Sequence, residues 1–330
     1  MLNTGPAKLP SAFLGCDAGF AAADTAIFGA PFDGTVSYRP GARFGPQQMR
    51  MESISMETYS PYLDEDLLDR AIVDLGDLEL PFGNTELALK LIQEQAAVIV
   101  QAGKKPLMLG GEHLVTLPAA EAVLANYPDL CFVHFDANAD LRESYLDERL
   151  SHASVMRRLH ELVGDDRIFQ FGIRSGEREE FVFANSGHIS QTLFTTKGVE
   201  VLAERLGNKP VYLTIDLDVL DPSVFPGTGT PEPGGLTFSE LLAAIHALKT
   251  LNLVAADLVE LAPQYDTSGI STAAALKLMR EVLLLLASPV ETKPTVIEPA
   301  ETETVETDSS SEQVSSAAGT SSKEQQQNVR

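Results

Sequence analysis

The chain has 330 residues, of which 44% are hydrophobic and 22% charged, and its formal net charge is −23 at pH 7. This composition supplies enough apolar side chains for a large core, and the acidity argues against nucleic acid as a partner. No apolar run is long enough to span a bilayer, and residues 1–19 lack the basic and apolar pattern of a signal peptide. With only two cysteines, the sequence predicts a protein of the reducing cytoplasm with no membrane partner.

Strand-like apolar runs alternate with helix-like segments along the chain. The runs typical of strands are 25–32, 71–78, 106–110, 130–135, 167–173, 210–216 and 253–261. The segments typical of helices are 85–102, 117–127, 154–162, 197–206, 237–250 and 271–286. This alternation predicts an α/β fold with a mainly parallel sheet between helices, and such sheets bind ligands at the carboxyl ends of their strands.

The composition changes after the last predicted helix. Residues 288–330 are rich in Glu, Thr, Ser and Gln and contain eight acidic and three basic residues. We expect one folded domain over residues 1–287 and a disordered acidic tail over residues 288–330. The tail is either a dispensable solvated segment or an arm that binds a partner.

Three polar residues alternate directly after the apolar run 130–135, namely Asp136, Asn138 and Asp140. An extended chain sends residues i, i+2 and i+4 to one face, so we expect these side chains to project together as the strand leaves the core. The alternative is a solvated loop whose carboxylates cap a helix.

A second strand end repeats the pattern with Asp216 and Asp218. Carboxylates that converge from two strand ends repel one another unless cations neutralise them. His113 follows a further strand after the pair Gly110 and Gly111, which permits a tight turn. The three segments together predict a site for divalent metal ions, with His113 as a candidate ligand.

These motifs resemble those of the ureohydrolase family, which includes arginase and agmatinase. The matching segments are Gly-Gly-Glu-His at 110–113, Asp-Ala-Asn-Ala-Asp at 136–140, Ser-His at 151–152, Ile-Asp-Leu-Asp-Val-Leu-Asp-Pro at 215–222, Pro-Gly-Thr-Gly-Thr-Pro at 226–231 and Asp-Leu-Val-Glu at 257–260. The resemblance implies a three-layer αβα sandwich around a sheet of about eight strands. It also makes residues 1–287 a catalytic domain that uses two manganese ions to hydrolyse a guanidino group to urea and an amine.

Within that family the segments 31–46 and 172–180 resemble agmatinases more than arginases. Arginases carry an asparagine, which meets the substrate carboxylate, at the position of Arg142, and agmatine has no carboxylate. The implied reaction converts agmatine to putrescine and urea. Guanidinobutyrate, guanidinopropionate and guanidine are alternative substrates for the same chemistry.

The resemblance also implies a ligand set. One manganese ion takes His113, Asp136, Asp140 and Asp216, and the other takes Asp136, Asp216, Asp218 and residue 138. The family has histidine at 138, whereas this chain has Asn138. An amide oxygen is a weaker ligand than imidazole for a first-row transition metal, so a metal-impaired homologue with a binding or regulatory role is a second hypothesis.

Two further residues receive roles from the resemblance. Glu260 would bind the guanidinium group of a small cationic substrate, and His152 would deliver a proton to the leaving amine. Without the resemblance, Glu260 is a surface carboxylate and His152 the start of a helix. His134 is expected to be a buried, hydrogen-bonded histidine. Members of the family usually form homo-oligomers, either trimers or hexamers, and the resemblance implies the same here.

Overall fold

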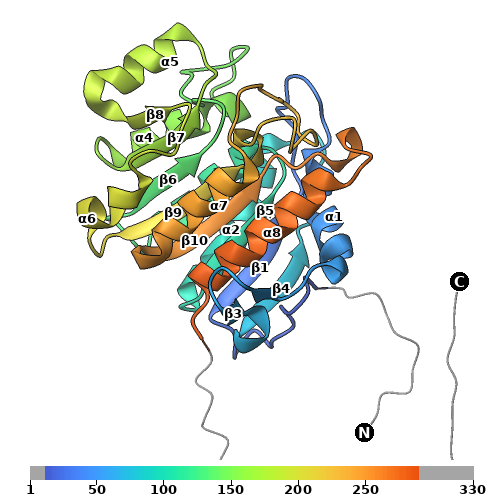
Figure 1. Cartoon of the computed structure of the whole chain (residues 1–330). Helices are drawn as coiled ribbons and strands as arrows, with labels where there is room; N and C mark the ends of the chain where they lie inside the picture. Colours follow the sequence, from blue (N-terminus) through green and yellow to red (C-terminus); the bar gives the residue numbers. More distant parts are fainter. Residues whose placement is uncertain (1–11, 290–330) are drawn as a thin grey trace, which may run out of the picture. The chain divides into compact units, whose positions relative to one another are not determined.

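The computed structural model describes residues 12–289, which form a parallel eight-stranded sheet between two layers of helices (Figure 1). This arrangement confirms the predicted α/β sandwich. In chain order the strands of the sheet are β1 (Thr25–Ala30), β4 (Ile72–Asp77), β5 (Lys105–Gly110), β6 (Cys131–Phe135), β7 (Ile168–Ile173), β8 (Ser190–Leu193), β9 (Pro210–Asp216) and β10 (Asn252–Val259). Their spatial order is β4-β1-β5-β10-β9-β6-β7-β8.

Helices cover both faces of this sheet. They are α1 (Gly45–Glu52), α2 (Thr85–Gln101), α3 (Thr116–Leu124), α4 (Val155–Val163), α5 (Arg178–Phe183), α6 (Leu202–Leu206), α7 (Phe238–Ala247) and α8 (Ile270–Leu286). Buried side chains of α1, α6, α7 and α8 form one hydrophobic core, and those of α2, α3 and α4 form the other. Because both faces are covered, the central strands are apolar at nearly every position. Along β5, Leu107 and Leu109 enter the first core while Met108 enters the second.

Some elements differ from the sequence prediction. Strand β8 was missed because it lies at the sheet edge and its residues, Ser190 to Leu193, are polar or only partly buried. Helix α1 was missed because its mostly polar residues lack a clear apolar repeat. The short antiparallel pair β2 (Tyr59–Ser60) and β3 (Glu65–Asp66) was also missed. The segment predicted as one helix over 197–206 is a 3₁₀ turn followed by the short α6.

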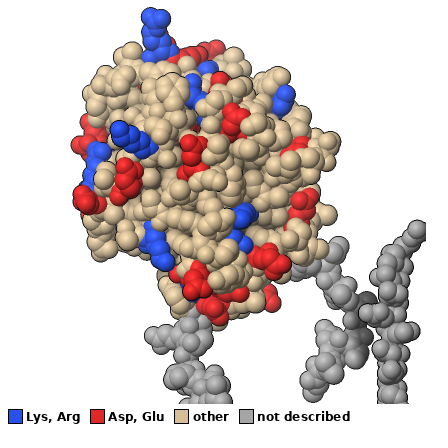
Figure 2. All heavy atoms as spheres, viewed as in Figure 1, with Lys and Arg blue, Asp and Glu red and all other residues tan. Residues whose placement is uncertain are grey.

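The sheet order brings four strand ends together. Strands β5, β10, β9 and β6 are consecutive neighbours at the centre of the sheet, so the loops that follow them share one edge. These are the loops that carry the predicted ligands. On the face drawn in Figure 2, basic groups are scattered among acidic ones. None of the helices within residues 12–289 is long and apolar enough to cross a membrane.

The last helix ends at Leu286, where the sequence predicts it to end. Ser288 follows and donates its backbone N–H to Asp24 Oδ2 at 2.6 Å. The rest of the predicted tail, from residue 290, lies outside the described residues, and the proposed division at 287 stays a prediction.

Candidate metal centre

His113 lies just beyond the carboxyl end of β5, after a turn through Gly111. A Cβ atom at Gly111 would collide with the backbone of Phe32, so this close approach requires glycine. The backbone N–H of His113 donates to Glu260 Oε1 at 2.9 Å. The turn therefore fixes both the direction of the imidazole and one oxygen of Glu260.

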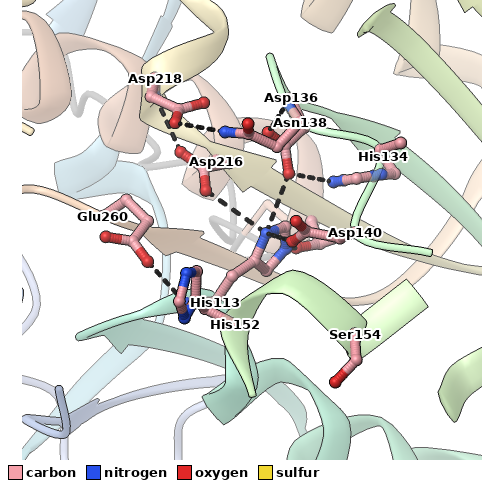
Figure 3. Close-up of polar contacts among 12 residues, drawn as sticks. His113, His134, Asp136, Asn138, Asp140, His152, Ser154, Asp216, Asp218 and Glu260 are labelled. Carbon is pink, nitrogen blue, oxygen red and sulfur yellow. Dashed lines mark hydrogen bonds and ion pairs between the residues drawn. The ribbon is translucent and has the colours of Figure 1, made fainter. Parts of the chain in front are cut away.

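The Nδ1 atom of His113 faces three carboxylates (Figure 3). It lies 3.1 Å from Asp136 Oδ2, 3.2 Å from Asp140 Oδ2 and 3.4 Å from Asp216 Oδ2. None of the three contacts has hydrogen-bond geometry, so this buried nitrogen has no hydrogen-bond partner among the described residues. A nitrogen surrounded in this way by carboxylate oxygens has the environment of a metal ligand.

The other ring nitrogen of His113 sets the tautomer. Its Nε2 lies 3.0 Å from Thr214 Oγ1, and the Thr214 hydroxyl donates to Asp257 Oδ1 at 2.6 Å. Because Thr214 gives its only proton to Asp257, it accepts the Nε2–H of His113. Tyr212 OH, which donates to Asp257 Oδ2 at 2.8 Å, completes the arrangement. In the neutral ring the unprotonated Nδ1 then lies among three carboxylates, which is favourable only with a cation between them.

A proton competes with a metal ion for that place. Burial lowers the pKa of His113, but the neighbouring carboxylates outweigh burial and raise the pKa well above its ordinary value. Metal binding at Nδ1 must displace this proton, so metal affinity falls as the pH falls.

The loop after β6 brings Asp140 back toward His113. Because β6 ends at Phe135, the alternation predicted for an extended chain continues only to Asn138, which pairs with Ser175 as an isolated bridge. Asp140 has a φ of 53°, in the left-handed region. Asp136 and Asp140 do project toward the same atom, His113 Nδ1, but a turn at Asp140 rather than a continuous strand places its carboxylate there.

The carboxylates of Asp136, Asp216 and Asp218 also lie together, with one oxygen of each within 4.8 Å of the others. All three residues are buried. Burial raises the pKa of Asp216 and Asp218 well above the ordinary value, and neighbouring carboxylates raise it further. Such crowding of like charges is stable at neutral pH only when cations or protons neutralise it.

Asn138 directs the NH₂ group of its amide, rather than the amide oxygen, toward Asp218. Its Nδ2 donates to Asp218 Oδ2 at 2.9 Å. The same oxygen accepts a hydrogen bond from the Thr230 hydroxyl, with Oγ1 at 3.1 Å. The other oxygen of Asp218 accepts the Ala137 backbone N–H at 3.2 Å. A metal ion at Asp218 must compete with these donors. The residues fit one divalent ion well, and a second ion finds carboxylates but no nitrogen ligand at 138.

Glu260 follows β10 directly and is buried. Its φ is 66°, and its backbone N–H donates to Gly111 O at 2.8 Å. The left-handed conformation costs a non-glycine residue roughly 1–2 kcal/mol, and strain of this kind is concentrated at functional sites. Burial raises the pKa of Glu260 well above its ordinary value, and the neighbouring Glu112 adds to the effect. The surface alternative for Glu260 is wrong.

His152 begins a 3₁₀ turn, His152–Ser154, and is partly buried. Its backbone N–H donates to Thr35 Oγ1 at 3.1 Å, and its Nε2 lies 3.3 Å from Ser37 Oγ. Tyr145 packs edge-on against the imidazole with ring centroids 5.8 Å apart. Burial lowers the pKa of His152, so the ring is mainly neutral at pH 7.

A cavity of about 190 Å³ opens beside these residues and is lined by Asp140 and His152 among others. Its charged wall contains Arg142, whose Nη1 lies 3.2 Å from Glu177 Oε1 and whose Nε lies 3.5 Å from Glu180 Oε2. Both acids line the same cavity, so its carboxylates outnumber its single guanidinium.

His134 lies behind Asp136 rather than in the cavity. Gln170 Nε2 lies 3.0 Å from His134 Nδ1 and donates to it, so the proton of the ring is on Nε2, 2.8 Å from Asp136 Oδ2. The structure thus shows the expected buried, hydrogen-bonded histidine, which orients a carboxylate of the site.

Several residues of the candidate metal centre were not predicted from the sequence. Tyr212 and Thr214 share a strand face with Asp216 at two-residue spacing, and this period could have identified them. Thr35 and Ser37 lie in the loop after β1, where no periodic signal exists.

Known proteins share this fold and these motifs. The model of the arginase family matches residues 23–285. An agmatinase from Bacillus subtilis (strain 168) is 50% identical over 266 residues, which cover 79% of this chain and 91% of that protein. A crystal structure from Clostridium difficile is 50% identical with a TM-score of 0.80 and covers 82% of this chain and 99% of its own. The agmatine ureohydrolase structure from Thermoplasma volcanium is 33% identical with a TM-score of 0.76, over 84% and 94% of the two chains. This chain belongs to the arginase family, which confirms the resemblance seen in its motifs.

Proposed function

We propose that this protein hydrolyses agmatine to putrescine and urea with bound manganese. The observation that carries the proposal is the convergence of His113 Nδ1 with oxygens of Asp136, Asp140 and Asp216. The similarity to agmatinases described above supports the choice of substrate.

His113, Asp136, Asp140 and Asp216 would hold one Mn²⁺ ion firmly. Asp218, together with shared oxygens of Asp136 and Asp216, would hold a second ion more weakly, because Asn138 offers an amide oxygen where the family has a histidine. When bound, such ions would lower the pKa of coordinated water far below that of bulk water and stabilise negative charge on the reacting group.

Glu260 would hold the guanidinium group of the substrate. Its Oε1 is fixed by the His113 N–H, and the rigid turn leaves its other oxygen, Oε2, for the ligand. A carboxylate positioned beside the metal ligands orients the guanidinium carbon toward the reactive water. The leaving amine then needs a proton, and the neutral His152 takes one from solvent and passes it on.

The charge of the cavity favours a cationic substrate tail. Arg142 could bind a carboxylate, but Glu177 and Glu180 already pair with it. Glu177 and Glu180 together outweigh the single Arg142, and this remaining negative charge suits the distal ammonium of agmatine better than the carboxylate of guanidinobutyrate.

A urea assay on the full chain tests this function. Manganese-loaded protein is expected to release urea from agmatine with a kcat/KM above the values for guanidinobutyrate, guanidinopropionate and guanidine. Another preferred guanidino compound would correct the substrate alone. Absence of urea from every compound, with metal shown to be bound, would overturn the proposal in favour of a binding or regulatory role.

Glu177→Gln should weaken the preference for agmatine. The change leaves Arg142 with one fewer carboxylate and removes a negative charge at the cavity wall. We expect kcat/KM for agmatine to fall by about 3- to 10-fold, the effect of about 1 kcal/mol in an exposed electrostatic contact, while that for guanidinobutyrate holds or rises. Glu179→Gln, at an exposed position in the first turn of α5, is the matched control. Equal losses on both substrates would exclude a role in charge selection.

Thr35→Val should slow proton delivery without removing the histidine. The Thr35 hydroxyl accepts the His152 N–H and donates to buried Glu112. We expect kcat to fall by about 10-fold, part of the roughly 10²- to 10⁴-fold effect of a positioned acid–base group. The pH profile should shift, and Thr35→Ser should restore both quantities. A loss that serine does not rescue would indicate a packing role.

A further inference from the structure

A second group of metal-ligating side chains lies outside the candidate metal centre. His160 belongs to α4, Asp165 to the turn after it, and His188 to the segment that precedes β8. Asp165 Oδ1 lies 2.8 Å from His160 Nε2 and 2.8 Å from His188 Nδ1. We propose that these residues form a binding site for Zn²⁺ or a similar divalent transition-metal ion, here called the His160 site.

The donor atoms suit such an ion. The two imidazole nitrogens and the carboxylate oxygen all lie within 4.8 Å of one another. Bonds of about 2.0–2.1 Å in tetrahedral geometry separate two ligand atoms by about 3.3 Å. Opening each 2.8 Å contact by about half an ångström would give the separations that a shared ion requires between Asp165 and each imidazole.

Both imidazoles are held in place by packing. The His188 ring stacks on Phe183 with centroids 4.5 Å apart and an interplanar angle of 20°. The His160 ring meets Phe183 edge-on at 5.1 Å, and the Arg157 guanidinium lies 3.7 Å from the Phe183 centroid. Because Phe183 positions both rings, little side-chain entropy remains to be lost on metal binding.

The backbone directs His188 toward the other two residues. Gly187 has a φ of 96°, which reverses the chain at the end of the helical segment Ala184–His188. A residue with a Cβ rarely adopts this conformation. The turn thus joins ligands that are 28 positions apart in the chain.

An ion can reach the His160 site from solvent. The exposed fraction of the side chain is 14% for His160, 37% for His188 and 55% for Asp165. Three protein ligands leave a coordination position for water or a small anion. The net charge of −23 also raises the local concentration of cations.

The two sites differ in ligand type. Two imidazoles and one carboxylate favour Zn²⁺, Ni²⁺ or Cu²⁺, whereas the oxygen-rich centre at His113 suits Mn²⁺. We therefore expect the His160 site to bind Zn²⁺ in protein already loaded with manganese. A bound ion would tie the end of α4 to the segment before β8 and stabilise this part of the fold.

Calorimetric titration of ZnCl₂ into the manganese-loaded full chain, in excess Mn²⁺, tests the proposal. We expect one additional Zn²⁺ per chain and a rise in Tm that saturates at that ratio. His188→Gln and Asp165→Asn should each weaken this binding by at least about 10-fold. His246→Gln is the matched control and should not weaken it, because His246 lies on α7, where its Nε2 is 2.9 Å from Glu281 Oε2. Zinc that exchanges into the manganese centre would do so equally in every variant.

Equal Zn²⁺ affinity in the wild type and both variants would overturn the proposal and leave a hydrogen-bonded triad. Tm in the absence of zinc establishes that each variant is folded. Asp165→Asn keeps the size and shape of the side chain in the turn. It therefore provides the test of zinc binding if the His188→Gln variant does not fold.

Discussion

Asp216→Asn is expected to lower agmatine hydrolysis by about 100- to 1,000-fold, the scale on which losing one charge-stabilising group acts. Asp216 Oδ2 lies 3.4 Å from His113 Nδ1, and this carboxylate also borders Asp218. It is thus placed to be shared by the two metal positions proposed above. Metal affinity should fall by more than about 100-fold, since the loss of a group that only hydrogen-bonds to a metal ligand already lowers affinity by about 10- to 100-fold.

The same substitution should stabilise the metal-free protein. Burial and the neighbouring carboxylates raise the pKa of Asp216, so the folded chain binds that proton more tightly than the unfolded chain does. The unfolding free energy therefore falls as the pH rises from the ordinary aspartate value through the raised one. Asparagine removes this penalty and keeps the oxygen that accepts the Asp218 N–H. We expect the Tm of chelator-treated protein at pH 7.5 to rise by about 2–4 °C.

Elemental analysis, urea release and Tm with and without manganese measure these effects together. Asp129→Asn is the matched control, because the Asp129 side chain is 76% exposed and its Oδ1 lies 3.6 Å from Arg167 Nη2, away from the metal centre. A variant with lower metal-free Tm and unchanged metal content would show that Asp216 supports the fold rather than the ion.

Asn138→His should strengthen the weaker metal position by about 10- to 100-fold and raise urea output at limiting manganese. The Asn138 amide donates a hydrogen bond to Asp218, and this bond competes with a second ion for the same carboxylate. An imidazole would remove that donor and supply a nitrogen lone pair. As isolated, the natural chain should hold one manganese ion firmly and take up a second only at millimolar supply.

Asn138→Ala separates the two effects of that substitution. It removes the N–H group that faces Asp218 without supplying a ligand. Manganese titrations should show the large gain only with histidine. Two tightly held ions per natural chain before loading would contradict this account of Asn138, as would an Asn138→His variant with no gain on any guanidino substrate.

Features that follow from local burial patterns could be predicted from the sequence, whereas features imposed by tertiary contacts could not. Strands β5, β6, β9 and β10 were predictable because burial on both faces leaves them apolar throughout. His113 and Asp216 could be placed at strand ends for the same reason. The left-handed turns at Asp140 and Glu260 could not be predicted, since tertiary contacts impose them against local preference.

Contacts between distant loops were equally inaccessible. Thr35 meets His152 across 117 positions of sequence, and neither residue carries a signal for the other. The orientation of the Asn138 amide depends on donors and acceptors that only the folded loops bring together. The asparagine at 138 was evident from the motif, whereas its hydrogen bond to Asp218 depends on contacts that form only in the folded protein.

The sheet order also determines when, during synthesis, the centre of the sheet can be completed. Leu109 of β5 pairs with Leu258 of β10, and β10 in turn separates β5 from β9. During translation the ribosome must therefore release nearly the whole domain before the strand that completes the sheet centre is available. The proposed ligands at the ends of β5 and β9 are brought to their native spacing only across β10, so nascent chains arrested before β10 are expected to bind manganese more weakly than the complete chain.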